Sequence, residues 1–322
     1  MNTTTQTPPA TDATAVRTRR GLLKCLAWAG TGIVWTVAGG VPKGIDLGLG
    51  LGEANAESAG FSFVQISDTH MGFKAEANPD PNATLQLALD RIAALPTKPA
   101  MMIHTGDVTH LSKPAEFDTA DQLLKGARLD THFIPGEHDV IGDDGKQFFA
   151  RFGGKDAKPG GWYSFDQGGV HFVALVNVMG FKPGTGGTIG HDQLEWLEAD
   201  LKGKAASTPI VVLAHVPLWP IYPQWGWSTG DADQAMGYLK KFGSVTVLNG
   251  HIHQVVQKVE GNITFHTARG TAFPLPAPGT APKPGPMPVE APRLRSLLGL
   301  TTVSYVETEH MLAVVDETLA PG

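Results

Sequence analysis

From residue 61 onward, short apolar runs rich in β-branched and aromatic residues alternate with segments whose apolar residues recur at helical spacing. This alternation is typical of layered α/β folds. We predict strands at 61–67, 100–105, 131–135, 170–177, 209–214 and 244–248, and helices at 82–95, 115–126, 191–202 and 231–242. Towards the C-terminus we predict strands without helices between them, at 254–259, 262–266, 301–307 and 312–315. This order predicts an α/β fold of the α+β type, a four-layer α/β/β/α sandwich of two mixed β-sheets flanked by helices.

The composition places the chain among globular proteins. Its 322 residues are 42% hydrophobic and 17% charged, which is enough to bury a sizeable core. The net charge is −6, and no stripe of Lys and Arg interleaved with aromatic residues is present. Both observations argue against a surface that binds nucleic acid.

The first 56 residues differ in character from the rest. The heptad Thr18-Arg19-Arg20-Gly21-Leu22-Leu23-Lys24 resembles a twin-arginine export signal. A moderately apolar stretch follows at 25–41, and Ala54-Asn55-Ala56 is a small-x-small site for a signal peptidase. The alternative is a membrane anchor, but the apolar run is short and contains several glycines, so no permanent anchor is expected. We expect the twin-arginine translocation machinery to export the protein and a signal peptidase to cleave it near Ala56. The mature chain would then begin at Glu57 and be periplasmic or secreted.

The only cysteine agrees with this interpretation. Cys25 lies inside the leader, so the mature chain at 57–322 would carry neither a free thiol nor a disulfide. It also stands before the apolar run instead of at its end, which argues against lipid attachment at this position.

Polar motifs follow five of the predicted strands. They are Ser67-Asp68-Thr69-His70, Thr105-Gly106-Asp107, Pro135-Gly136-Glu137-His138-Asp139, Ala214-His215-Val216-Pro217 and Asn249-Gly250-His251-Ile252-His253. Each motif alone has an ordinary explanation, such as a turn or a buried core histidine. Together they indicate a metal site, because strand ends in a layered fold bring carboxylate and imidazole ligands from separate elements to one place. We expect the glycines before Asp107, Glu137 and His251 to permit sharp turns.

The five motifs resemble those of the calcineurin-like metallophosphoesterase superfamily, whose pattern is D-x-H, G-D, G-N-H-D/E, H and G-H-x-H. The resemblance runs from about Asp68 to His253 and implies a single domain of this type at 57–322. It also implies two divalent or trivalent metal ions, Fe, Mn or Zn. The implied ligands are Asp68, His70 and His253 for one ion, Glu137, His215 and His251 for the other, and Asp107 as the bridge. One departure is clear, because Glu137 replaces the asparagine of the family.

The resemblance implies hydrolysis of a small-molecule phosphate monoester or diester by a water shared between the metals. His138 would stand beside the metals as a general acid. For Asp139 two interpretations stay open, a carboxylate that orients the His138 imidazole or a plain turn residue. His110 is either a phosphate contact or a surface-loop residue. A non-enzyme alternative, a catalytically altered metal-binding or ligand-sensing protein on the same fold, is favoured by Glu137 and disfavoured by His138.

Two further segments bear on the substrate. The loop at 216–227 carries Trp219, Tyr222 and Trp225, which would form either an apolar wall for an organic leaving group or a structural cap. The proline-rich segment at 274–292 would be extended and stiff, either bordering the mouth of the site or wrapping the surface. Neither segment decides the natural substrate.

Overall fold

The structure is a computed structural model, and it describes residues 33–38, 41–46, 61–182, 184–306 and 311–320. The chain divides into two compact units, Met1–Ala56 and Glu57–Gly322. In the first unit, β1 (Ile33–Ala38) and β2 (Val41–Asp46) pair antiparallel. The twin-arginine heptad and the cleavage site at 54–56 lie outside the described residues, so export stays a prediction. In the described ranges, no helix is both long and apolar enough to span a bilayer.

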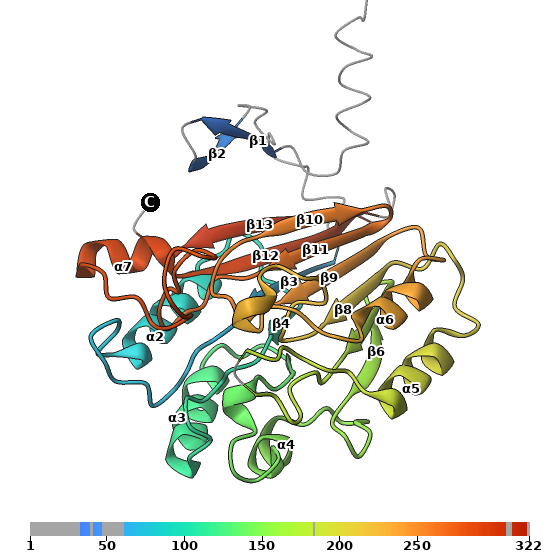
Figure 1. Cartoon of the computed structure of the whole chain (residues 1–322), viewed down its shortest axis with the longest axis horizontal. Helices are drawn as coiled ribbons and strands as arrows, with labels where there is room; N and C mark the ends of the chain where they lie inside the picture. Colours follow the sequence, from blue (N-terminus) through green and yellow to red (C-terminus); the bar gives the residue numbers. More distant parts are fainter. Residues whose placement is uncertain (1–32, 39–40, 47–60, 183, 307–310, 321–322) are drawn as a thin grey trace, which may run out of the picture. The chain divides into compact units, whose positions relative to one another are not determined.

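Two mixed sheets form the centre of the second unit (Figure 1). The five-stranded sheet has the order β13 (Met311–Thr318), β12 (Gly299–Val306), β3 (Ser62–Ile66), β4 (Met101–His104) and β5 (Thr131–Phe133). The six-stranded sheet has the order β10 (Gln257–Glu260), β11 (Ile263–Thr267), β9 (Val245–Asn249), β8 (Ile210–Leu213), β7 (Val170–Ala174) and β6 (Tyr163–Gln167). Strands β3 to β5 are parallel, as are β7, β8, β9 and β11, while the remaining pairs are antiparallel.

Alternating side chains divide most of the core into three large apolar clusters. Phe63 and Phe172 point into the layer between the sheets, with ring centroids 5.3 Å apart. Their neighbours Val64 and Val173 face the helices instead, as the two-residue period of a strand requires. The helices α2 (Pro81–Ala93), α3 (Pro114–Lys125), α4 (Lys146–Phe152) and α7 (Ala291–Leu297) cover the five-stranded sheet, and α5 (His191–Leu201) and α6 (Ala232–Leu239) cover the other. The predicted four-layer α/β/β/α sandwich is confirmed.

Most predicted elements are present, with ends shifted by a few residues, but α7 was not expected. It lies between β11 and β12, so the prediction of C-terminal strands without intervening helices is wrong there. Pro292 stands in the first turn of α7, where its missing N–H costs no helical hydrogen bond, and Leu294 packs into the outer core. The short elements α4 and β6 were missed as well.

Candidate metal centre

The motifs that follow β3, β4, β5, β8 and β9 converge at one edge of the two sheets. Backbone hydrogen bonds join the loops within each sheet, from the Asp68 N–H to the Gly106 carbonyl (3.0 Å) and from the Gly250 N–H to the His215 carbonyl (3.1 Å). Between the sheets, the His251 N–H donates to Asp68 Oδ1 (3.1 Å). The third motif forms a short 3₁₀ turn, Glu137–Asp139. Strands from both sheets therefore deliver their polar ends to the same place.

The backbone at this edge is unusual. Eight described residues other than glycine have positive φ, and five of these are predicted ligands: Asp68 (53°), His70 (41°), Asp107 (54°), His251 (68°) and His253 (53°). For residues with a Cβ atom this conformation costs about 1–3 kcal/mol each, and such strain clusters at functional sites. The turns aim these side chains inward at the expense of local stability.

The glycines in the motifs act in two different ways. Gly106 has φ of 97°, so it permits the turn as expected. Gly136 and Gly250 do not have positive φ and instead allow close approach. A Cβ atom on Gly136 would lie 2.0 Å from Asp107 Oδ1, and one on Gly250 would lie 2.1 Å from Ser67 Oγ. The expectation that all three glycines serve sharp turns is correct for Gly106 alone.

One group of predicted ligands comprises Asp68, His70 and His253, whose ligand atoms lie within 4.8 Å of one another. The Nε2 atoms of His70 and His253 face each other at 3.3 Å, and His253 Nε2 lies 3.3 Å from Asp68 Oδ1. All three residues are buried. This is the arrangement that the resemblance implied for the first metal.

A second group of the same size comprises Glu137, His215 and His251. His215 Nε2 is 3.0 Å from Glu137 Oε2, and His251 Nδ1 is 2.9 Å from Glu137 Oε1. Asp107 lies between the two groups, with its Oδ2 3.5 Å from His70 Nε2 and 3.4 Å from His215 Nε2. Asp107 therefore stands where a bridging carboxylate would be needed.

Hydrogen bonds to backbone carbonyls fix the tautomers of two imidazoles. The Nδ1–H of His215 donates to the Thr105 carbonyl and that of His253 to the Phe273 carbonyl, both at 2.6 Å. In the neutral ring each Nε2 is then left as a bare lone pair that points into the cluster. Such bonds orient metal-ligating histidines in general.

The cluster also contains buried polar atoms that form no hydrogen bond within the described part of the chain: Asp68 Oδ2, His215 Nε2 and His251 Nε2. Buried polar atoms are costly when they are left unpaired. Together with the facing imidazole nitrogens, they form a mixed nitrogen and oxygen donor set of the kind that Fe, Mn and Zn accept. The residues therefore fit metal ions.

The electrostatics favour cations. Burial alone would raise the pKa of Glu137, but the imidazoles that face it lower this pKa well below its usual value. Burial would also raise the pKa of Asp68, and again the neighbouring imidazoles lower it. For His215, burial would lower the pKa, but the carboxylates of Asp107 and Glu137 raise it well above its usual value. Ionised buried carboxylates need positive partners, which metal ions would provide.

The sequence profile of the calcineurin-like phosphoesterase family matches residues 61–255, more than half of the chain. The chain belongs to this family. A probable cyclic nucleotide phosphodiesterase of Rhodopseudomonas palustris is 26% identical over 240 residues, covering 68% of this chain and 83% of the relative. A 3′,5′-cyclic-nucleotide phosphodiesterase of Nostoc sp. is 21% identical over 235 residues, covering 70% and 83%.

Solved structures agree with the fold. A dimetal phosphatase from Danio rerio has a TM-score of 0.57 at 15% identity and covers 81% of this chain and 99% of its own. A purple acid phosphatase from yellow lupin has a TM-score of 0.56 at 14% identity, with 80% of this chain and 51% of its own covered. The family uses a dinuclear metal centre. The calcineurin-like phosphoesterase is a metal-dependent phosphoric ester hydrolase.

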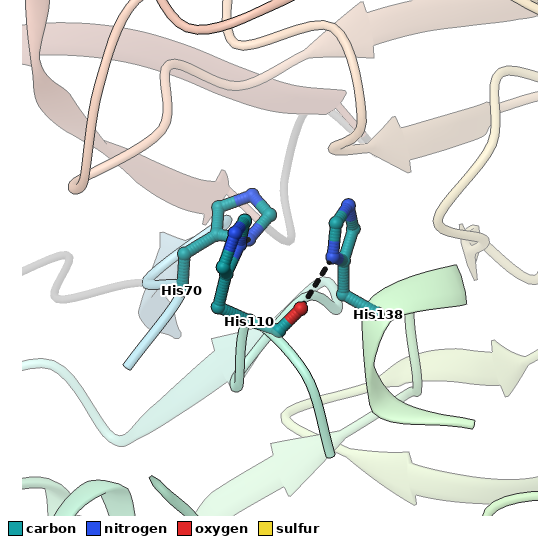
Figure 2. Close-up of side chains that lie close together, drawn as sticks. All are labelled: His70, His110 and His138. Carbon is teal, nitrogen blue, oxygen red and sulfur yellow. Dashed lines mark hydrogen bonds between the residues drawn. The ribbon is translucent and has the colours of Figure 1, made fainter. Parts of the chain in front are cut away.

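His70, His110 and His138 of the phosphoesterase lie close together (Figure 2). The His138 Nδ1–H donates to the His110 carbonyl at 2.6 Å, and the two rings stack with centroids 5.0 Å apart. The His138 ring is also 4.8 Å from that of His70. Burial alone would lower the pKa of His138, but the carboxylates of Asp107 and Glu137 raise it above its usual value. Because Nδ1 is occupied, Nε2 is the nitrogen that can exchange a proton.

Asp139 does not orient this imidazole, so the catalytic role that we considered for it is not supported. Its Oδ1 accepts from the Thr109 N–H (2.7 Å) and hydroxyl (2.9 Å), and its Oδ2 accepts from the N–H groups of Val108 and Gly136 (both 3.0 Å). The fully buried carboxylate thus joins the loop that carries Asp107 to the loop that carries Glu137. The imidazole of His138 is oriented by a backbone carbonyl instead.

A cavity of about 650 Å³ opens over the cluster and is lined by Trp225 and His110. Two of the aromatic residues that we considered for its wall do not line it. Trp219 packs against Phe265 of β11, with ring centroids 6.1 Å apart, and lines a separate, smaller cavity. Tyr222 packs against the ring of Trp225, at 5.1 Å. The loop at 216–227 is therefore partly wall and partly cap.

Sequence reasoning missed other residues that line this cavity, among them Phe181, Phe273 and Lys283. Phe181 lies in a loop without motif context. Phe273 contributes both its ring, stacked 4.7 Å from His70, and the carbonyl that orients His253. Lys283 lies in the proline-rich segment at 274–292. This segment borders the cavity, which agrees with the interpretation that it lies at the mouth of the site.

Proposed function

We propose that the phosphoesterase works outside the cytoplasm and hydrolyses an organic phosphate ester, with a nucleotide phosphodiester as the first substrate class to test. The observation that carries the proposal is the pair of ligand groups joined by Asp107 beneath a cavity with His138 in its wall. The cyclic nucleotide phosphodiesterases among the relatives support the choice of ester. Export rests on the twin-arginine heptad at 18–24 and the cleavage site at Ala56.

The residues take distinct roles in this proposal. Asp68, His70 and His253 would hold one metal ion, Glu137, His215 and His251 the other, and Asp107 both. When bound, the metal pair supplies an activated water and neutralises the charge of the phosphate. The carbonyls of Thr105 and Phe273 keep the ligating imidazoles in the required tautomer.

His138 would protonate the leaving group. Its Nδ1–H is held by the His110 carbonyl, so a proton on Nε2 can pass to the departing ester oxygen as the phosphorus–oxygen bond breaks. His110 would contact the phosphate oxygens, a role supported by its stacking on His138 and its place in the cavity lining. An alkoxide is a poor leaving group without this proton, so the acid matters most for alkyl esters.

The proposal is tested with the full chain, reconstituted with Mn, Fe or Zn and assayed on aryl and nucleotide phosphate monoesters and diesters. We expect two metal ions per chain, measured on the same sample, and turnover of at least one ester class. Glu137 favours one other candidate, a metal-binding or ligand-sensing protein without catalysis. Two bound metals with no turnover of any ester would support that candidate and refute the enzyme.

A further inference from the structure

The cavity over the cluster is too large for a phosphate alone. Its volume of about 650 Å³ lies within the range of sites that hold a whole small organic molecule, about 300–1,000 Å³. In addition to predicted metal ligands, its lining includes the aromatic residues Phe181, Trp225, Trp227 and Phe273. The site therefore accommodates a substantial organic part of the substrate as well as the phosphoryl group.

One wall belongs to the segment 274–287, which we call the proline strap. The Met287 N–H donates to the Pro274 carbonyl at 2.9 Å and closes the strap at its base. The Gln254 side chain, one residue after a predicted ligand, donates to the Pro276 carbonyl at 2.8 Å. The strap is thereby tied to the loop that carries His253, and residues 282–286 line the cavity.

Among the described residues that line this cavity, Lys283 is the only Lys or Arg. It is exposed, and it forms no ion pair or hydrogen bond in the part of the chain that the structure describes. Pro282 and Pro284 flank it; proline has a nearly fixed φ, and the residue before a proline is confined to extended backbone. The prolines thus restrict the backbone that carries this unpaired ammonium group, while the exposed side chain of Lys283 keeps its own rotamer freedom.

No carboxylate in the described part of the chain pairs with the ammonium group of Lys283. The carboxylates in the cavity lining, Asp107 and Glu137, are those assigned to the metal ions. No hydrogen bond or ion pair joins the described strap residues 282–286 to a predicted ligand. With metal ions bound, the cavity would offer positive charge at two places, the metal cluster and the strap.

We propose that Lys283 binds a second negatively charged group of the substrate, separate from the phosphoryl group that is hydrolysed. The substrate would then be a phosphate ester with an organic part and two anionic groups, such as a nucleotide that carries a further phosphate. This inference rests on the proposed function for the identity of the reacting phosphate. Lys283 would act as a specificity residue and take no part in the chemistry.

Two thymidine compounds separate the second anion from the reacting ester. One is the p-nitrophenyl ester of thymidine 5′-phosphate, and the other is the same ester with an added 3′-phosphate. Both release p-nitrophenolate from the same bond. The metal-loaded full chain should show a higher kcat/KM for the 3′-phosphorylated ester than for the ester without the 3′-phosphate. Lys283→Gln should lower the kcat/KM of the 3′-phosphorylated ester about fivefold to tenfold, the scale of one exposed charged contact. It should leave the kcat/KM of the other ester unchanged. Lys283→Arg should retain the preference.

Lys182→Gln is the matched control, because it removes the same charge from an exposed lysine beside Phe181 that does not line the cavity. Raising the ionic strength should weaken the preference of the parent protein but not that of Lys283→Gln. Equal losses on both esters would place Lys283 on the reacting phosphate and overturn the inference. Unchanged kinetics on both esters would overturn it as well, while leaving the proposed function intact.

A binding measurement keeps the two proposals apart. Calorimetric titration compares thymidine 3′,5′-bisphosphate with thymidine 5′-phosphate on the parent protein and on Lys283→Gln. If no phosphate ester of any class is hydrolysed but Lys283→Gln selectively weakens binding of the bisphosphate, the proposed function fails and the second anion site stands. If the two ligands bind the parent protein equally, the inference is wrong.

Discussion

Replacing His138 by asparagine separates proton donation from loop structure. The side-chain amide of asparagine can occupy the place of Nδ1 in histidine, so His138→Asn can keep the 2.6 Å hydrogen bond to the His110 carbonyl. It has no group at the position of Nε2, where the structure leaves the exchangeable proton. The variant should therefore fold and bind metal as the parent does, yet lack the acid.

The expected magnitudes follow from these two contacts. Since one neutral hydrogen bond contributes about 1 kcal/mol, its retention keeps the free energy of unfolding within about 1 kcal/mol of the parent value. Loss of a general acid lowers kcat about 100-fold or more, or about 2.7 kcal/mol at roughly 1.36 kcal/mol per tenfold change. The loss should apply to alkyl esters. For p-nitrophenyl esters, whose leaving group needs little protonation, we expect a loss below about tenfold.

The assay measures kcat for an alkyl and a p-nitrophenyl phosphodiester, together with metal content and thermal unfolding of the same preparations. His191→Asn is the control, because this histidine lies on α5 with 76% of its side chain exposed. It should leave all values unchanged. If both esters lose activity equally, His138 does not protonate the leaving group. If a metal ion is lost, His138 is itself a ligand.

Three further outcomes are expected. Changing Arg19 and Arg20 to lysine should hold the precursor in the cytoplasm, which fractionation and N-terminal sequencing will show; an intact Met1 on exported protein would refute cleavage. Glu137→Asn should weaken one of the two metal sites about tenfold or more in a titration of metal-free protein, and unchanged affinity would remove Glu137 from the ligands. Burial alone would raise the pKa of Asp200, but hydrogen bonds, including one from His171, lower this pKa below its usual value. The ionised carboxylate of Asp200 therefore stabilises the folded protein, and this stabilisation is lost as the pH falls through the pKa of the folded state. His171→Ala should therefore lower Tm at pH 7, and the difference from the parent should shrink below about pH 4; a constant difference would contradict the linkage.

The convergence of the candidate ligands was predictable because each follows a strand, and strand ends are what a layered fold brings together. The short 3₁₀ turn at Glu137–Asp139 shows where such reasoning stops. Three consecutive residues send their side chains in three directions, Glu137 to the imidazole of His215, His138 to the carbonyl of His110, and Asp139 to the backbone of Val108. The sequence leaves open whether Asp139 orients His138, and the turn geometry sends the two side chains to different partners.

The residues that form the cavity walls were less predictable than the candidate ligands beneath the cavity. Tryptophans at 219, 225 and 227 stand in one loop, yet only those at 225 and 227 line the cavity, because the first packs on the outer face of the six-stranded sheet. No periodicity marks which side of an irregular loop faces a cavity. Similarly, nothing in the sequence around Lys283 except the flanking prolines marks it as a cavity residue. Its place in the cavity wall depends on how the strap folds over the cluster.

Glu137 bears on whether the family's chemistry applies unchanged to this chain. Its two carboxylate oxygens face His215 and His251 at 3.0 and 2.9 Å, so the longer side chain reaches both imidazoles of the second ligand group. The replacement of asparagine therefore changes the charge of the site more than the convergence of its ligands. With Asp68 and Asp107, the cluster then has three carboxylates, and each added negative charge tightens cation binding while making the bound cation a weaker Lewis acid. The third carboxylate also weakens the attraction between the cluster and an anionic substrate. A second anionic group on the substrate, bound by Lys283 away from these carboxylates, would restore part of that attraction.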